Sequence, residues 1–466
     1  MLSVSRFRKG QHMVQRQKVL IAATVTASVF ILTACGGGGG SDTADASFSD
    51  SPSGALSAWG FDNADDVGTS RLDYAEKQLS DVDIKIDQTA FDAQKFTTRV
   101  ASGNVPDVVQ MDRQFVGTYA AQGLITPLDE CFATHSVEPD DQYYESVMDD
   151  VSWDDKVWAV PQFYQPPAII LNKRVMDAAG VTADQIDTSK PDVLLEAIGK
   201  MYQESGGNPS VLGFDSVGVN QAGLWLLGYG GELMDDDGVP ALDSPENAKA
   251  INFLKQMFDA QGGYAKYKSF TDSFDVFGDA NPYVADQVGA QVNAQWYVNV
   301  LSPYADQVQI EAVPFRNVDG EPFTVTGGQA FVIPVGAKNA DAACAWAVNL
   351  TSQDAWMAAG EARAKTIADE PGAINTGLFT GSPEADQAIR EKFVTDSGNA
   401  GFDQTIATFY DVVGEGESFG ASAAGQEIQT ELKNAVTSTL LGDKSAEDAL
   451  ADAQEAAMRA YDKVMK

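Results

Sequence analysis

The chain has 466 residues, and its 31 lysines and arginines face 67 aspartates and glutamates, which gives a formal net charge of −36 at pH 7. Such an acidic chain repels nucleic acids and anionic membrane surfaces, so we exclude both as direct partners. Two histidines and three cysteines do not supply the tightly spaced ligands of a zinc site, and we expect neither a metal nor a cofactor.

The first 34 residues have the layout of a secretion signal. Five basic residues and no acidic residue precede position 19, and residues 19–34 are almost wholly apolar or small. A basic segment before a short apolar segment is typical of a signal peptide, and this apolar run is shorter than the roughly 20 residues that span a bilayer. Leu-Thr-Ala-Cys at 32–35 resembles the bacterial lipobox, which implies that Cys35 is lipidated. The alternative is an ordinary buried cysteine in a membrane helix.

Residues 35–53 are expected to form a flexible tether. Five glycines follow Cys35, and glycine loses more backbone entropy on ordering than any other residue. A Gly/Ser-rich linker of about 18 residues reaches on the order of 25 Å. The lipobox resemblance implies a diacylglyceryl group, and two acyl chains anchor a protein stably. We therefore expect a lipid-anchored protein on the extracellular face of a bacterial cell membrane.

The rest of the chain, residues 54–466, is too long for one core and predicts two domains. Its first part alternates strands and helices. Apolar or alternating runs predict strands at 55–59, 82–86 and 106–111, and helical spacing predicts helices at 69–81 and 91–103. This order indicates an α/β fold with a mostly parallel sheet. Ligands of such sheets bind at the carboxyl ends of the strands, which singles out Trp59-Gly60 and Asp112-Arg113.

A second α/β region follows. Apolar runs predict strands at 168–173 and 329–336, and helical spacing predicts helices at 174–180, 247–263, 341–352 and 445–466. In the last of these helices Leu450, Ala453 and Ala457 form part of one apolar stripe, which indicates that the helix docks on the fold.

Several chemical sites can be weighed from the residues alone. Segment 234–244 fails as an EF-hand because Leu233 and Ser244 stand where ligands are required, so we interpret its Asp-Gly as a hairpin turn. His135 lies in a polar loop without a nucleophile motif, which argues against Ser-His or Cys-His catalysis. The many acidic residues leave chance carboxylate pairs, and with them a glycoside hydrolase, open. Cys131 and Cys344 fit either a disulfide or two reduced buried thiols.

Five segments, in order behind the lipobox, resemble the extracellular solute-binding proteins of ABC transporters, and most closely the carbohydrate-binding group (family 1) that includes maltose-binding protein. The resemblance covers essentially the whole mature chain and rests on FTTRVASGNVPDVVQMD, GLITPLD, WAVPQFYQPPAIILNKRVMDAAG, TGGQAFVIPVGAKNADAACAWAVNLTSQDAW and SAEDALADAQ. A further segment, AQWYVNVL, resembles a tryptophan loop of the same family.

The family resemblance implies a periplasmic-binding-protein-like fold of two α/β lobes, joined by a hinge, with the ligand in the cleft between them. It places the first lobe at 54–164 and 327–362, and the second at 165–326 and 363–466. On this map Cys131 and Cys344 fall in one lobe, which favours the disulfide. The lobes are expected to close on the ligand like a hinged trap.

The resemblance also carries binding residues onto this chain. The segment PDVVQMDRQF is similar to a family motif whose Asp and Arg bind sugar hydroxyls, which implies that Asp112 and Arg113 bind ligand. In VPQFYQPPAIILNK, Gln165 stands where the family has a binding acid, so the specificity is expected to differ. Trp296 matches a tryptophan that stacks on the ligand.

The chemistry of sugars supports these choices independently. Polar side chains satisfy the hydroxyl groups, and flat aromatic rings cover the C–H faces. The candidate aromatic residues are Trp59, Phe163, Tyr164, Trp225 and Trp296, and for each the alternative is ordinary core packing. Gly327 and Gly328 either let the backbone approach the ligand or merely turn the chain.

We therefore predict a monomeric, lipid-anchored binding protein, not an enzyme, that delivers an oligosaccharide to an ABC permease. The alternatives are a binding protein for a non-sugar solute and a secreted glycoside hydrolase. A surface adhesin is disfavoured because the sequence has no β-rich repeats.

Overall fold

The computed structural model describes residues 48–61, 64–370 and 372–466. The predicted signal peptide, Cys35 and the first part of the predicted tether lie outside the described residues. The last part of that tether belongs to the fold, because Phe48 packs on a hydrophobic core and the Ser49 N–H donates to the Asp341 carboxylate (3.3 Å). The tether boundary expected at residue 53 is therefore wrong.

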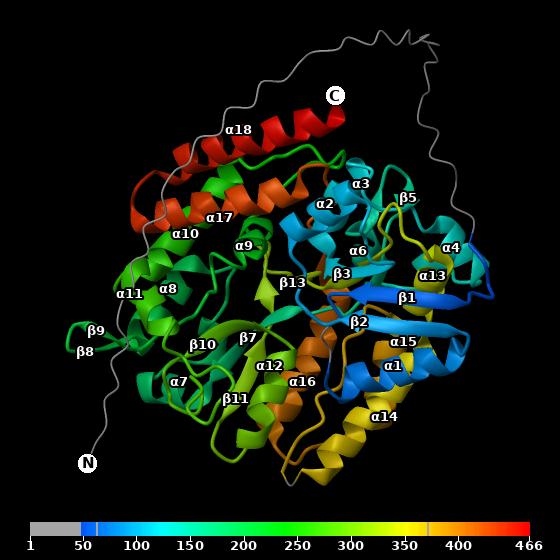
Figure 1. Ribbon diagram of the computed structural model, residues 1–466. Helices are drawn as coiled ribbons and strands as arrows, with labels where there is room; N and C mark the ends of the chain where they lie inside the picture. The colour runs from blue at the N-terminus through cyan, green and yellow to red at the C-terminus, as the bar shows by residue number, and fades with distance from the viewer. Residues whose placement is uncertain (1–47, 62–63, 371) are drawn as a thin grey trace, which may run out of the picture. The chain divides into compact units, whose positions relative to one another are not determined.

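Within the described residues, the first sheet has five strands in the order β2-β1-β3-β14-β6 (Figure 1). Strands β1 (Gly54–Trp59), β2 (Val82–Asp87) and β3 (Val108–Asp112) are parallel, as predicted. Strand β14 (Gln329–Val332) runs antiparallel to both β3 and β6 (Val160–Gln162). The sheet is therefore mixed, because β14 enters it from the opposite end.

Local signals set the ends of the first helices. Helix α1 (Asp66–Gln78) begins three residues before the predicted start, because the Asp65 carboxylate accepts from the Gly68 N–H and caps it. Helix α2 (Ala93–Ser102) is capped by Asp92 and ends at Gly103, whose φ of 67° suits glycine. In the chain, α1 connects β1 to β2 and α2 connects β2 to β3, which are parallel strands of the first sheet.

The second sheet has the order β10-β7-β11 and is antiparallel. Its central strand β7 (Pro167–Asn172) is buried at every residue, which explains its continuous apolar run, and its neighbours are β10 (Ala290–Ala294) and β11 (Ile310–Val313). Helix α16 (Ala400–Val412) packs on β11, and helices α10 (Pro245–Asp259), α17 (Gly425–Leu441) and α18 (Ala446–Met465) pack on one another (Figure 1).

The remaining elements are short or lie outside the two sheets. The helices are α3 (Val116–Ala121), α4 (Asp129–Thr134), α5 (Pro139–Gln142), α6 (Glu145–Asp149), α7 (Lys173–Ala179), α8 (Pro191–Met201), α9 (Ala222–Gly228), α11 (Tyr264–Thr271), α12 (Trp296–Leu301), α13 (Ala340–Leu350), α14 (Gln353–Asp369) and α15 (Pro383–Phe393). The strands are β4 (Ser152–Trp153), β5 (Lys156–Val157), β8 (Gln203–Ser205), β9 (Asn208–Val211), β12 (Phe315–Arg316), β13 (Pro322–Val325) and β15 (Gly416–Glu417).

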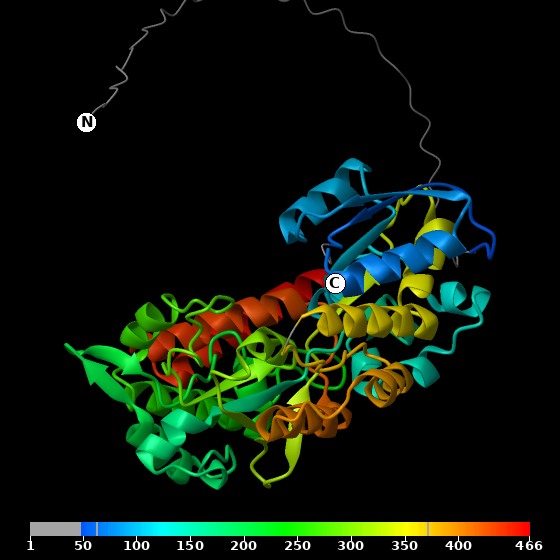
Figure 2. The same ribbon diagram turned by 90° about the horizontal axis from the view of Figure 1, so that it is seen from below.

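Each sheet has its own hydrophobic core, one built mainly from residues 56–160 and 330–350 and the other mainly from residues 164–325 and 374–457. The lobe boundary expected at 362/363 is wrong, because it falls inside helix α14. This helix lies along α1 (Figure 2), and its Trp356 shares a smaller apolar cluster with Ile389 of α15 and Val67 of α1. Helices α14 and α15 therefore belong with the first sheet.

The chain passes from β6 of the first sheet to β7 of the second at 162–167, from β13 of the small sheet β12-β13-β15 to β14 of the first sheet at 325–329, and from α15 to α16 at 393–400. We name the first two the crossing segments, and they are hydrogen-bonded to each other, since the Gln165 N–H donates to the Gly327 carbonyl (2.8 Å). The crossings bring the ends of β3, β6 and β14 to one place. Over the described part of the chain, no helix combines the length and the apolar character needed to cross a membrane.

Candidate functional site

Two adjoining cavities lie at the crossing segments, and both are lined by Gln165 and Gln329. The first has a volume of about 260 Å³ and the second a volume of about 320 Å³. Residues of both lobes line the two cavities. Asp112 and Gln329 belong to the first sheet, whereas Gln429 lies in α17 and Trp296 in α12. We name this pair of cavities the cleft.

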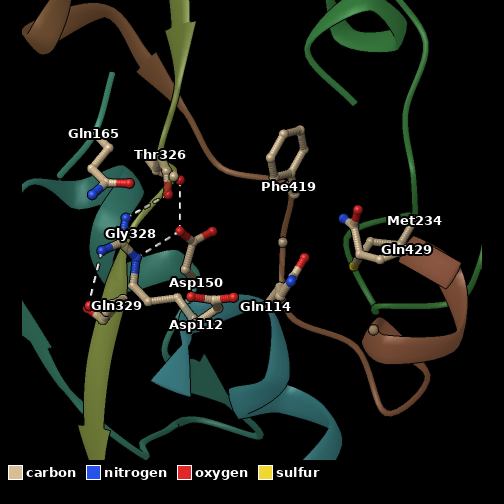
Figure 3. A pocket seen from close by; sticks show the side chains of 14 residues that line it. Asp112, Gln114, Asp150, Gln165, Met234, Thr326, Gly328, Gln329, Phe419 and Gln429 are labelled. Carbon is tan, nitrogen blue, oxygen red and sulfur yellow. Dashed lines mark hydrogen bonds and ion pairs between the residues drawn. The ribbon is translucent and has the colours of Figure 1, made fainter. Parts of the chain in front are cut away.

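The sheet topology explains why these side chains meet. Because β14 is antiparallel to β3, Gln329 at the start of β14 is paired with Asp112 at the end of β3, and it is also paired with Gln162 of β6. Gln165 follows three residues after Gln162. In Figure 3, Gln165 and Gln329 lie on one side of the first cavity, with Met234 and Gln429 across from them.

Asp112 offers an exposed carboxylate to the first cavity. The surrounding protein partly desolvates this group and raises its pKa above the usual value, although Gln329, Arg113 and Lys433 oppose that effect. A carboxylate in such a place is a strong acceptor for hydroxyl groups. The prediction that Asp112 binds ligand stays a prediction, and its position in the cleft is consistent with it.

Arg113 lies at the same cavity, but its guanidinium is directed into the protein. The side chain is buried (2% exposed), and its Nε–H donates to Asp150 at 3.0 Å. Its other nitrogens donate to the backbone carbonyls of Phe163, Thr326 and Gln329, as the dashed lines of Figure 3 indicate in part. Arg113 therefore fastens the two crossing segments to each other. The expected direct role in ligand binding is not supported, because nearly all its N–H groups are used within the protein.

The two neighbouring glycines have different roles. A Cβ atom on Gly328 would stand 2.3 Å from Arg113 Nη1 and 2.3 Å from the Phe163 carbonyl oxygen, whereas one on Gly327 would meet the Gln165 carbonyl oxygen at 3.7 Å. Gly328 is thus needed for the close approach of Arg113 to the backbone. Gly327 lines the first cavity with room for a side chain.

The second cavity has an aromatic edge. The Trp296 ring is 37% exposed and lines this cavity. Phe277, 70% exposed, stacks on it with ring centroids 5.9 Å apart and an angle of 22° between the planes. Exposed, stacked rings of this size form a flat apolar surface beside polar groups, which suits the face of a sugar.

Two of the other predicted aromatic residues line the second cavity from within the protein. Phe163 packs edge-on against Trp356 with centroids 5.2 Å apart, and the guanidinium of Arg71 lies 4.8 Å from the centre of its ring. Tyr164 is 1% exposed and packs edge-on against Tyr144. Both residues line the second cavity, and the buried Tyr164 does not offer a stacking face.

Trp59 and Trp225 are in the cores, and neither lines the cleft in the described part of the chain. Trp59 is 1% exposed and its Nε1–H donates to Thr89 (3.2 Å). Trp225 is fully buried and its Nε1–H donates to the Ser216 carbonyl (3.2 Å). The predicted ligand contact of both tryptophans is not supported, because core packing takes up their rings.

Several cleft residues escape sequence reasoning. They have no distinctive motif of their own, and they come from loops, helices and a crossing segment: Gln114, Asp150, Met234, Thr326, Phe419 and Gln429 line the first cavity, and Asp65, Gln295, Asn299 and Arg363 line the second. The glycine-rich segment 414–425 around Phe419 is the one local pattern that could have indicated a cleft segment, since such loops carry function in many folds.

Arg363 in the second cavity is already paired. Its guanidinium donates to both oxygens of Asp66 at 2.7–3.1 Å and to Asp65 at 3.0 Å. The N–H groups of Arg113 and Arg363 are thus largely hydrogen-bonded within the protein. The polar groups that remain available to a ligand in the cleft are mainly amides and carboxylates. Such a lining fits a neutral polar ligand better than an anionic one.

Three further predictions concern residues away from the cleft. Cys131 and Cys344 are joined by a disulfide within the first core. The turn at Asp235–Gly238 closes a short antiparallel bridge, and the Asp235 side chain accepts from the Asp237 and Val239 N–H groups. His135 ends the short helix α4, and its pKa is lowered by burial. Among the described residues, no group of His, Cys, Asp and Glu side chains is arranged to hold a metal ion.

Comparisons with known proteins agree with this architecture. The sequence profile described as bacterial extracellular solute-binding protein matches residues 66–355. A curated relative, the diacetylchitobiose binding protein DasA of Streptomyces coelicolor, is 24% identical over 253 residues, which make up 52% of this chain and 56% of that protein. The match thus spans little more than half of that relative.

Solved structures with the same fold cover most of the chain. An ABC transporter solute binding protein from Thermotoga lettingae, bound with α-D-tagatose, has a TM-score of 0.66 and 20% identity, and the match covers 88% of this chain and 100% of that one. The GacH receptor of Streptomyces glaucescens, determined unliganded and with acarbose, has a TM-score of 0.63 and 18% identity over 88% and 99%. These matches confirm the predicted two-lobed fold.

Proposed function

Because this chain belongs to the family of bacterial extracellular solute-binding proteins, we propose that it captures a neutral carbohydrate in the cleft and delivers it to an ABC permease. The observation that carries the proposal is the combination, in one cleft, of amide and carboxylate side chains with the exposed Trp296 ring, on which Phe277 stacks from outside the two cavity linings. That combination matches the two surfaces of a sugar, its hydroxyl edges and its C–H faces.

The size of the cleft supports an oligosaccharide. The two cavities have volumes of about 260 Å³ and about 320 Å³, and Gln165 and Gln329 line both of them. Phe419 lines the first cavity and Trp296 the second. A ligand that reached both rings would span the junction, with the two glutamines bonded to its central hydroxyl groups.

The binding step is hinged closure of the lobes. We expect backbone angles to change at the two crossing segments, 162–167 and 325–329, and at the connection from α15 to α16 when the lobes move. Arg113 is hydrogen-bonded to Asp150 and to the backbone of both segments. These bonds hold the two segments together, so we expect them to move as one hinge. Closure on a ligand sequesters it from water without any bond chemistry, so the protein acts as a carrier.

Membrane attachment is part of the proposal. The signal sequence and lipobox place a lipidated Cys35 at the start of the mature chain, and the glycine-rich segment after it lets a monomeric binding domain reach the permease. Labelling with a radioactive fatty acid tests this, because a Cys35→Ser variant is expected to lose the label and to be released from the membrane fraction.

The central experiment is a thermal-shift screen of the mature Cys35→Ser protein against D-tagatose, N,N′-diacetylchitobiose, maltotetraose and related saccharides, with product analysis of every hit. A ligand at 100 times its dissociation constant stabilises a protein by about 2.7 kcal/mol, which corresponds to a shift of about 3 °C for a chain of this size. A shift with intact sugar supports capture. Cleaved sugar supports a hydrolase, and no shift with any saccharide directs the search to other neutral solutes.

A further inference from the structure

Arg71 of helix α1 is a buried cation inside the first lobe. It is 0% exposed, and its guanidinium lies 3.9 Å from the centre of the Trp356 ring and 4.8 Å from that of Phe163. Its Nη1 donates to Gln162 Oε1 at 3.1 Å, whereas its Nε and Nη2 have no partner among the described residues. Burial lowers its pKa to about 9, so the group still carries its charge at neutral pH.

Gln162 begins a row of amides that leads to the cleft. Gln162 Nε2 donates to Gln110 Oε1 at 2.7 Å, and Gln110 Nε2 donates to Gln329 Oε1. Gln162 and Gln110 are 0% and 2% exposed, whereas Gln329 is half-buried and lines both cavities. The row therefore joins a buried charge to the junction of the cleft through three strands, β6, β3 and β14.

The direction of this row follows from the chemistry of its first member. A guanidinium has donors and no acceptor, so Gln162 must turn its oxygen to Arg71 and its nitrogen to Gln110. Gln110 must then accept from Gln162 with its oxygen and donate to Gln329 with its nitrogen. Gln329 accepts with its oxygen, which leaves its two N–H groups for the cleft, where one of them faces the Asp112 carboxylate.

We propose that Arg71 is a positioning residue, which fixes the direction of the Gln162-Gln110-Gln329 row so that Gln329 presents N–H donors at the junction of the cleft. This role rests on the proposed function of carbohydrate capture. It adds the requirement that the ligand place a hydrogen-bond acceptor, such as a hydroxyl, carbonyl or ring oxygen, at the junction of the cleft. A ligand with a donor alone at that position leaves Gln329 unpaired and is rejected.

The decisive variant is Gln162→Glu, which changes one atom outside the cleft. A carboxylate at position 162 accepts from Arg71 with one oxygen, and its other oxygen needs a donor from Gln110. The side-chain amide of Gln110 therefore flips to donate to residue 162 and accepts from Gln329. The amide of Gln329 flips in turn and directs its oxygen to the cleft. The new carboxylate gives the buried charge of Arg71 a counter-charge, so the melting temperature is expected to stay the same or rise. The matched control is Gln94→Glu, the same change at an exposed position in α2.

The first readout needs no ligand. In the ¹⁵N-labelled protein, the Gln329 side-chain N–H that does not face Asp112 is expected to exchange rapidly with water, and in Gln162→Glu one Gln329 N–H is expected to become protected by the bond to Gln110. The second readout is calorimetry with the saccharide of the panel that the wild type binds. Gln162→Glu is expected to weaken binding about tenfold, the value of one lost hydrogen bond, and Gln94→Glu to leave it unchanged.

Two variants of Arg71 complete the test. Arg71→Lys keeps a side chain that only donates, so it is expected to retain affinity for the saccharide within about threefold. Arg71→Met has no donor to fix the direction of the Gln162-Gln110-Gln329 hydrogen bonds, so it is expected to lower the affinity at an unchanged melting temperature. Unchanged Gln329 exchange in Gln162→Glu, or equal affinities of the Lys and Met variants, overturns the proposal. If no saccharide binds the wild type, the proposed function fails, and the exchange measurement still decides the role of Arg71.

Discussion

Replacing Arg113 by methionine is expected to destabilise the protein strongly, because the buried Asp150 then loses its counter-charge. Asp150 is 6% exposed and would keep two hydroxyl donors, Thr326 Oγ1 at 2.7 Å and Ser418 Oγ at 2.6 Å. Removing one partner of a buried pair costs about 3–5 kcal/mol. The backbone carbonyls that Arg113 now satisfies lose their donor as well, so the lower end of this range is a minimum.

The assay is urea denaturation at pH 7, read by tryptophan fluorescence. The unfolding free energy of Arg113→Met is expected to fall by at least 3 kcal/mol. Arg459→Met is the control, since Arg459 pairs with Glu455 on the exposed face of α18, with side chains 63% and 73% exposed, and such pairs contribute less than about 1 kcal/mol.

The pH dependence separates the charge from the packing. Burial raises the pKa of Asp150, and Arg113 opposes that rise, so the pKa of Asp150 is expected to climb further in the variant. The loss of stability in Arg113→Met should therefore shrink as pH falls and Asp150 becomes neutral. The double variant Arg113→Met/Asp150→Asn should lose less than the sum of the single changes. A loss below 1 kcal/mol at pH 7 would refute the assignment of Arg113 as the fastener of the crossing segments.

Three further outcomes follow from the same structure. Trp296→Ala is expected to weaken saccharide binding at least about tenfold in calorimetry with an unchanged melting temperature; full affinity would remove Trp296 from the site. Gly328→Ala is expected to lower the unfolding free energy by about 1–3 kcal/mol through its clash with Arg113, and Gly327→Ala to leave it nearly unchanged; equal effects would contradict the contact. Burial raises the pKa of Asp386 to about 7, so the folded state holds its proton up to higher pH than the unfolded state and stability falls as pH rises from about 4 to about 7; this slope should flatten in Asp386→Asn, and an identical slope would show that Asp386 does not titrate there.

The sequence alone determined the elements and the class of fold. Strands β1, β2, β3 and β7 and helices α2, α10 and α18 lie within a few residues of their predicted ranges, because periodicity, N-caps and terminal glycines act locally. The family resemblance is confirmed by the profile match over residues 66–355. The sequence singled out Asp112, Gln165 and Trp296, which line the cleft, and their contact with ligand remains a prediction.

The tertiary structure decided which side chains are free to bind. Trp225 and Trp296 are the same residue type in similar apolar surroundings along the chain, yet one is fully buried among aromatic side chains and the other is exposed beside the second cavity. Arg113 stands beside Asp112 in the sequence and points the opposite way, into acceptors that lie from 37 to 216 positions away in the chain. Burial and hydrogen-bond partners of this kind depend on contacts between distant segments, and no local pattern encodes which segments will meet.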